Sequence, residues 1–176
     1  MATLGKSGED VMRFGVDDET LVERNGGEMG GTLIVVDCEA PFGVGAPSVG
    51  DMTEFGAVDV NALREGRQET FHGTDCSEET FRRFRDWVAP RMPVVFVSDN
   101  PAYDFQWINF YFWKYFNENP FGHSGRRIAD FYAGLVGDFR STQKWKRLRR
   151  TKHDHDPVHD ALGNAEALIR ILDGER

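Results

Sequence analysis

Hydrophobic positions in the first part of the chain follow strand patterns. Residues 32–36 form a continuous apolar run rich in β-branched side chains, which is typical of a buried central strand. Two more strands are predicted at 54–60 and 67–71, and they would form an antiparallel meander with the first. Another buried strand is predicted at 93–97, whereas glycines and prolines predict a loop at 41–50.

Helical periodicity follows these strands. Ser77 is placed to cap a helix that ends near Val88 and repeats its apolar residues on one face. Two longer helices are predicted at 101–117 and 157–172, with one or two shorter helices between them. Strands followed by a helix, a strand and more helices predict an α/β sandwich with a central mixed sheet.

Composition fits one globular domain. The chain has 176 residues, of which 40% are hydrophobic and 28% are charged. Residues 1–30 are Gly-rich and acidic with weak periodicity, so we expect a loosely ordered extension followed by a domain at 31–176.

Composition also disfavours several classes of protein. No apolar run approaches the roughly 20 residues that span a bilayer, and the N-terminus lacks the layout of a secretory signal. Only Cys38 and Cys76 are present, which excludes a disulfide framework and a four-cysteine zinc site. We therefore expect a cytoplasmic protein in a reducing compartment, without a membrane partner.

Charge is distributed unevenly. The net charge of −8 argues against a protein that only coats nucleic acid. The segment 126–152 is nevertheless basic, with only Asp130 and Asp138 against Arg126, Arg127, Arg140, Lys144, Lys146, Arg147, Arg149, Arg150 and Lys152. Such a segment can steer a polyanion toward a metal-loaded acidic centre, or it can be the solvated face of a surface helix.

Two acidic residues end the first predicted strand. Asp37 and Glu39 lie two residues apart, so their side chains point to the same face. Carboxylates that face one way repel each other unless cations neutralise them. The pattern Asp-x-Glu is common on exposed strands, but at the end of an apolar strand it indicates a cation site.

Two more aspartates occupy similar positions at predicted helix starts. Asp104 and Asp160 each follow an Asn or Asp and a proline, in Asn100-Pro101-Ala102-Tyr103-Asp104 and Asp156-Pro157-Val158-His159-Asp160. This is a strong helix-start signature. Either aspartate alone can simply favour its helix dipole.

One histidine completes the set. His155 lies five residues before Asp160, so both can face one site, although His153 and His159 are nearby alternatives. A neutral histidine can accept a proton from an attacking water. Four carboxylates can hold two divalent ions roughly 3.5–4 Å apart for in-line displacement at phosphorus. Oxygen ligands favour Mg²⁺ or Mn²⁺ over zinc.

These residues resemble the motifs of the DEDDh (DnaQ-like) 3′–5′ exonuclease family, which has the ribonuclease H-like fold. The family's Asp-x-Glu matches Asp37 and Glu39, its Asn-x-x-Phe/Tyr-Asp matches 100–104, and its His followed five residues later by Asp-Ala matches 155–161. The resemblance covers about 32–172. Residues 160–168 are most similar to small stand-alone prokaryotic or phage exoribonucleases.

The resemblance implies a fold and a reaction. The fold would be a three-layer sandwich with helices on both sides of a mixed sheet. The protein would remove nucleotides from a single-stranded 3′ end, RNA being favoured, and family members are often homodimers. Two Mg²⁺ or Mn²⁺ ions would be held by Asp37, Glu39, Asp104 and Asp160, and His155 would be the general base.

Five residues are candidates for substrate contacts. Phe42 follows the first motif, where the family usually has Thr or a similar residue nearby. It could stack on the terminal base or anchor its loop by packing. Asn100 opens the second motif, and Arg147, Arg149 and Arg150 would bind phosphates.

Other interpretations remain. A DNA-directed proofreading or repair exonuclease would use the same residues, and a non-catalytic nucleic-acid-binding or protein-binding relative would share the fold. His153-x-His155 could belong to a metallo-β-lactamase-like zinc hydrolase, but Pro157 and Val158 stand where that motif needs Asp and His. The apolar helix segment 105–116 would be either wholly buried or half of a dimer contact.

Overall fold

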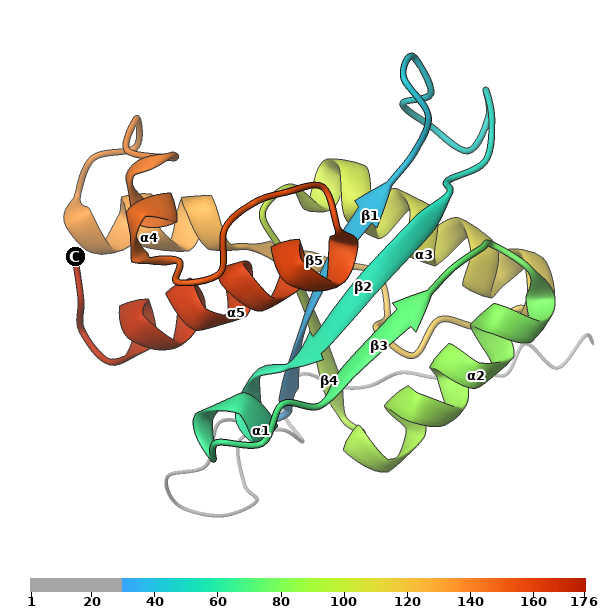
Figure 1. The fold of residues 1–176 in the computed structure, drawn as a ribbon, viewed down its shortest axis with the longest axis horizontal. Coiled ribbons are helices and arrows are strands. Elements are labelled where there is room, and N and C mark those ends of the chain that lie inside the picture. Colours follow the sequence, from blue (N-terminus) through green and yellow to red (C-terminus); the bar gives the residue numbers. More distant parts are fainter. Residues whose placement is uncertain (1–29) are drawn as a thin grey trace, which may run out of the picture. The chain divides into compact units, whose positions relative to one another are not determined.

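A five-stranded mixed sheet is the centre of the computed structural model, which describes residues 30–176 (Figure 1). Its order is β3-β2-β1-β4-β5, where β1 pairs antiparallel with β2 and parallel with β4. The strands are β1 Thr32–Glu39, β2 Glu54–Asp59, β3 Thr70–Gly73, β4 Val94–Ser98 and β5 Gly125–Arg127. The expected extension at 1–30 lies, apart from Gly30, outside the described residues.

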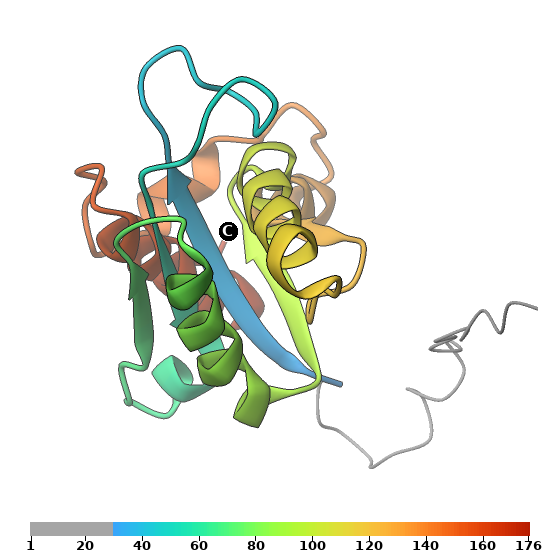
Figure 2. The same ribbon diagram turned by 90° about the vertical axis from the view of Figure 1, so that its right-hand side faces the viewer.

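Helices cover both faces of the sheet. The helical elements are α1 Val60–Arg64, α2 Glu78–Val88, η2 Ala89–Arg91, α3 Pro101–Phe116, α4 Ile128–Val136, η3 Lys144–Leu148 and α5 Pro157–Leu172. Figure 2 shows α2 and α3 in front of the sheet and α5 behind it. The predicted three-layer α/β sandwich is therefore confirmed.

Alternate residues of β1 supply the two apolar cores. Ile34, Val36 and Cys38 pack with the aromatic residues of α2 and α3. Val35 packs with the opposite core, which contains α4, η3 and α5. Because side chains alternate along a strand, Asp37 continues the row of Val35 and lies on the α5 face.

Several predicted elements are confirmed. The loop 41–50, the strand 54–60 and the helix 157–172 correspond to the structure within a residue or less. Ser77 caps α2, since its side-chain oxygen accepts a hydrogen bond from the Thr80 N–H.

The strand predicted at 67–71 is shifted. β3 begins at Thr70, because α1 and its following turn occupy the chain up to Arg67. The N–H of Arg67 donates to the carbonyl of Ala62, and its guanidinium pairs with Glu65 and Glu69. The short α1 and the three-residue β5 have no clear hydrophobic period and were not predicted from the sequence.

The aromatic helix α3 is not wholly buried. Trp107 and Tyr111 are inaccessible, whereas Phe110 and Trp113 are exposed. The wholly buried alternative is therefore wrong, and the dimer contact stays a prediction. Among residues 30–176, no helix combines the length and the apolar character needed to cross a membrane.

Candidate active site

The C-terminal end of β1 presents two carboxylates to the start of α5. Asp37 and Glu39 lie on the sheet face that α5 covers, and Asp37 is opposite Gly56 of β2. Asp160 lies in the first turn of α5 with only 1% of its surface exposed. Carboxylate oxygens of Asp37, Glu39 and Asp160 lie within 4.8 Å of one another, so the structure brings together three of the four predicted acidic residues in one cluster.

A glycine allows this close approach. A Cβ atom built on Gly56 would lie 2.2 Å from the carbonyl oxygen of Pro157, the first residue of α5. The helix start is held by Asp156, whose side chain accepts hydrogen bonds from the N–H groups of Val158 (2.9 Å) and His159 (3.1 Å). Gly56 and the Asp156 cap together place Asp160 beside Asp37.

Gly56→Ala is expected to destabilise the fold and to separate α5 from β2. The added methyl group would meet rigid backbone, and overpacking of this kind costs about 1–3 kcal/mol. Gly134→Ala is the matched control, because this α4 position has nothing within 4 Å of the added Cβ. Chemical denaturation of both variants measures the difference; equal stability would contradict the close approach.

The fourth predicted acidic residue, Asp104, lies outside this cluster, on the α3 side of β1. One of its carboxylate oxygens accepts a hydrogen bond from the backbone N–H of Cys38 (3.1 Å), and only 4% of its surface is exposed. Asn100 occupies the N-cap position of α3, where its carbonyl accepts from the N–H groups of Tyr103 and Asp104. Its exposed side chain makes no capping bond, so the amide can meet a substrate.

Two histidines, not one, reach the acidic residues. Nδ1 of His155 lies 3.7 Å from Oε1 of Glu39, and Nδ1 of His153 forms an ion-pair contact with Asp160. His159 instead points to Asp154, at 3.0 Å. Motif spacing favours His155 as the base, but it does not reveal that His153 folds against Asp160.

Burial and neighbouring carboxylates make Asp37, Glu39 and Asp104 hard to ionise. Desolvation, followed by the charges of Asp104, Asp160 and Glu39, raises the pKa of Asp37 well above its usual range. Burial likewise raises the pKa of Asp104 to about 7 and the pKa of Glu39 above its ordinary value. Among the described residues, Oδ1 of Asp160 has no hydrogen-bond partner, and Oδ2 meets Nδ1 of His153. These properties fit divalent cations, which would neutralise the cluster.

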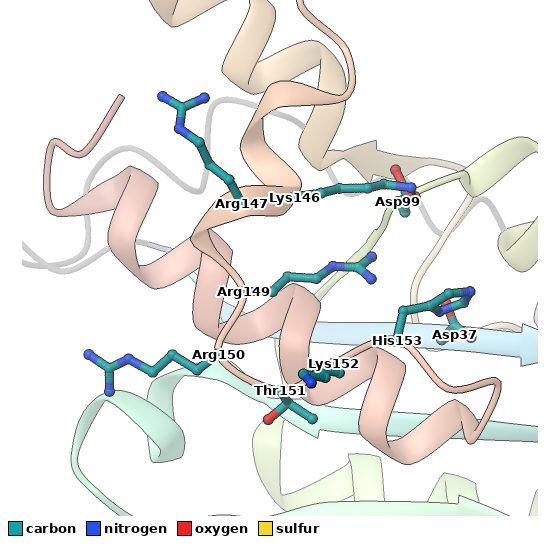
Figure 3. Close-up of a pocket in the computed structure, with 9 residues that line it drawn as sticks. All are labelled: Asp37, Asp99, Lys146, Arg147, Arg149, Arg150, Thr151, Lys152 and His153. Atoms are coloured by element: carbon teal, nitrogen blue, oxygen red, sulfur yellow. Dashed lines mark ion pairs between the residues drawn. The ribbon is translucent and has the colours of Figure 1, made fainter.

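A basic pocket of about 530 Å³ adjoins this cluster (Figure 3). Its lining includes the predicted metal ligand Asp37 and all three predicted arginines, whereas no role was predicted for Asp99 and Thr151. The lining residues are Asp37, Asp99, Lys146, Arg147, Arg149, Arg150, Thr151, Lys152 and His153. In Figure 3, Arg149 extends toward Asp37, whereas Arg147 and Arg150 point away from it. Lys146 crosses to Asp99, at 2.6 Å.

We call the basic side chains of this pocket the basic wall; they are Lys146, Arg147, Arg149, Arg150 and Lys152. Polar side chains attach this wall to α5. Glu166 accepts hydrogen bonds from the backbone N–H groups of Arg150 (2.9 Å) and Thr151 (2.7 Å). Buried Asn164 accepts a hydrogen bond from the Arg149 guanidinium, which also lies 5.1 Å from the centre of the Trp145 ring. The sequence places Asn164 one helical turn after Asp160, whereas Glu166 shares no helical spacing with that aspartate.

The loop between β1 and β2 carries an exposed aromatic ring. Phe42 is fully exposed, so it does not anchor the loop by packing. The loop is held instead by Gln106, whose side chain donates to the Gly45 carbonyl (2.9 Å), and by Tyr111, whose hydroxyl donates to Asp51 (2.6 Å). Phe42 is therefore free to stack on another group.

A solved structure shows the same fold. The nuclease domain of 3′hExo, described as a DEDDh family member bound to rAMP, superposes with a TM-score of 0.55 at 13% identity, covering 81% of this chain and 92% of that one. The fold is that of the DEDDh nucleases. A complex of E. coli ExoI with single-stranded DNA, in a zinc-bound form, gives a TM-score of 0.44 at 15% identity, covering 81% of this chain and 39% of that one.

One curated relative is similar in sequence. The 3′–5′ DNA exonuclease Cap18 of Escherichia coli is 33% identical over 105 residues, which cover 52% of this chain and 53% of Cap18. The chain thus spans about half the length of this relative. No protein-family profile matches the chain. The resemblance to DEDDh 3′–5′ exonucleases drawn from the motifs is confirmed by the shared fold and by this relative.

Proposed function

We propose that this protein is a divalent-metal-dependent 3′–5′ exonuclease that acts on single-stranded nucleic acid. The observation that carries the proposal is the cluster of Asp37, Glu39 and Asp160 within 4.8 Å, beside a pocket with a basic wall. The cluster can bind cations, and the basic wall can bind the phosphates of a polyanion.

The metal site would use the four acidic residues. Asp37, Glu39 and Asp160 would hold one cation, and Asp104 with Asp37 would hold a second, as the family resemblance implies. Carboxylate oxygens fit Mg²⁺ and Mn²⁺. When bound, such ions neutralise the cluster and stabilise charge on a phosphoryl group during displacement.

Other residues would orient the substrate and move the proton. His155 would accept a proton from the attacking water, and its position beside Glu39 supports this role. Arg149 extends toward Asp37 and can bind the phosphate nearest the reaction, since its guanidinium is held by Asn164. Phe42 would stack on the terminal base, and Asn100 would contact the 3′-terminal nucleotide.

RNA is the favoured substrate, and DNA is the second candidate. Residues 160–168 resemble those of small exoribonucleases, which supports RNA. The curated relative is named a DNA exonuclease, which supports DNA. Both nucleic acids have the phosphates and bases that the pocket and Phe42 would contact.

Labelled single strands test the function and the substrate together. RNA and DNA of one sequence, labelled at the 5′ end and at the 3′ end in separate reactions, are incubated with Mg²⁺ or Mn²⁺. We expect stepwise shortening of 5′-labelled strands, early release of the 3′ label, faster loss of RNA than DNA, and no reaction in chelator. Internal cuts or shortening from the 5′ end would disprove the proposal. If DNA is lost faster than RNA, DNA is the favoured substrate.

Replacing Arg147, Arg149 and Arg150 by Ala is expected to raise KM and to weaken its dependence on salt. Each lost contact with a single-stranded phosphate removes about 0.7 from the slope of log affinity against log salt, so three contacts remove about 2. The matched control replaces Arg82, Arg83 and Arg85 of α2, which lie outside the pocket. Steady-state kinetics from low to high salt would measure both; identical slopes would show that the basic wall is only a solvated face.

A further inference from the structure

A second group of possible metal ligands overlaps the carboxylate cluster. Ring nitrogens of His153 and His155 and a carboxylate oxygen of Asp160 lie within 4.8 Å of one another. The centres of the two rings are 4.4 Å apart. Asp160 therefore belongs to two ligand sets, one made only of oxygens with Asp37 and Glu39, and one that contains two imidazoles.

The two sets differ in the cation that they favour. Mg²⁺ takes oxygen ligands in octahedral geometry. Zn²⁺ binds imidazole nitrogen and carboxylate oxygen at about 2.0–2.2 Å, and three protein ligands with one open position form a common zinc site. Two imidazoles and one carboxylate are therefore a typical set of zinc ligands. The imidazole nitrogens favour zinc over magnesium.

Asp160 is built to receive a cation at this position. Only 1% of its surface is exposed, and among residues 30–176 Oδ1 lacks a hydrogen-bond partner, while Oδ2 meets Nδ1 of His153, itself one of the three ligands. The imidazoles are free to adjust, since the side chains of His153 and His155 are 52% and 75% exposed. The turn that carries them contains a left-handed residue, His155, with φ 65°. Small side-chain rotations can thus complete the site without moving a packed element.

We propose that His153, His155 and Asp160 bind Zn²⁺ and that this binding inhibits the protein. Zinc would bind the ring nitrogen of His155, the proposed base, so that this nitrogen could no longer accept a proton. Zinc would also bind the carboxylate of Asp160, which would then no longer be available to Mg²⁺. Mg²⁺-supported turnover would then stop. The zinc site rests on the ligand geometry alone, whereas its inhibitory effect rests on the proposed exonuclease function.

Direct metal binding tests the site without any nucleic acid. Zn²⁺ is titrated into the metal-free protein against a chromophoric chelator, and Co²⁺ is used as a spectroscopic probe of nitrogen ligation. His153→Ala should lower zinc affinity at least about 10–100-fold, the loss that even outer-shell partners cause. His159→Ala is the matched control, because its ring points to Asp154, and its zinc affinity should stay at the wild-type value.

Two binding results would overturn the site. One is equal zinc affinity of His153→Ala and His159→Ala, with both variants shown to be folded by circular dichroism. The other is zinc binding that is lost in Glu39→Gln but kept in His153→Ala, which would place the ion in the oxygen-only set.

Inhibition is measured separately, in saturating Mg²⁺ with increasing Zn²⁺. Each rate is divided by the zinc-free rate of the same variant, so differences in basal turnover cancel. His153→Ala should need at least about 10-fold more zinc than wild type for half inhibition, in line with its lower affinity. The inhibitory role would be overturned if zinc inhibits wild type and His153→Ala equally. It would also be overturned if zinc alone supports turnover. A wild-type protein without any zinc-free turnover would overturn the proposed function, and the binding result would then decide the zinc site.

Discussion

Replacing Asp37 by Asn is expected to lower turnover on the order of 10³-fold or more. Asp37 lies in the carboxylate cluster and beside Asp104, so it would contact both of the proposed cations. Charge stabilisation by such ions contributes several kcal/mol, and each 1.4 kcal/mol is about a factor of ten in rate. The amide keeps the shape of the side chain but loses the charge that holds the ions.

The same substitution is expected to stabilise the metal-free protein at neutral pH. In wild type, burial and neighbouring carboxylates raise the pKa of Asp37 well above its usual range, and burial raises the pKa of Asp104 to about 7. The folded state therefore holds these protons more tightly than the unfolded chain, whose Asp pKa is roughly 4. The stabilising contribution is complete below about pH 4 and is lost as the pH rises through the folded values.

Thermal unfolding in chelator measures this effect. The Tm of wild type should fall as the pH rises from about 4 to 8, and the fall should be smaller for Asp37→Asn. Asp86→Asn, at an exposed position of α2, is the charge-matched control and should keep the wild-type slope. Near-normal turnover of Asp37→Asn in Mg²⁺ would contradict the assignment of Asp37 as a metal ligand. If Asp37→Asn keeps the wild-type slope of Tm against pH, the proposed repulsion between the carboxylates is wrong.

His155→Ala is expected to lower kcat by about 10²–10⁴-fold, the range of general-base assistance. His155 lies beside Glu39, and the remaining activity of the variant should rise with pH because hydroxide replaces the missing base. Affinity for Mg²⁺ should change little, since the carboxylates are kept.

The neighbouring histidines provide the comparison. His153→Ala should cost much less than His155→Ala, although His153 contacts Asp160, and His159→Ala should cost least because its ring points to Asp154. Measurement of kcat for the three variants from about pH 6 to 9 separates them. If His153→Ala is the most damaging, the assignment by motif spacing is wrong and His153 is the base.

Local sequence signals determined the elements that carry the site. The Asn-Pro and Asp-Pro starts predicted α3 and α5, because proline and a capping residue favour the first helical turn whatever lies around it. Strand alternation placed Asp37 and Glu39 on one face, because that alternation is a property of the extended backbone. The motif order then indicated the family, and the structure confirmed its fold.

Tertiary packing decided what local patterns leave open. Arg149 rather than Arg147 or Arg150 reaches toward Asp37, because Asn164 of α5 holds its guanidinium. His153 meets Asp160 through a turn whose path no periodicity encodes. The approach of α5 to β2 depends on Gly56, whose missing side chain matters only once the two elements meet. Contacts between residues far apart in sequence depend on how the backbone packs. The sequence alone therefore predicted which residue types form the site, but not which side chains contact one another.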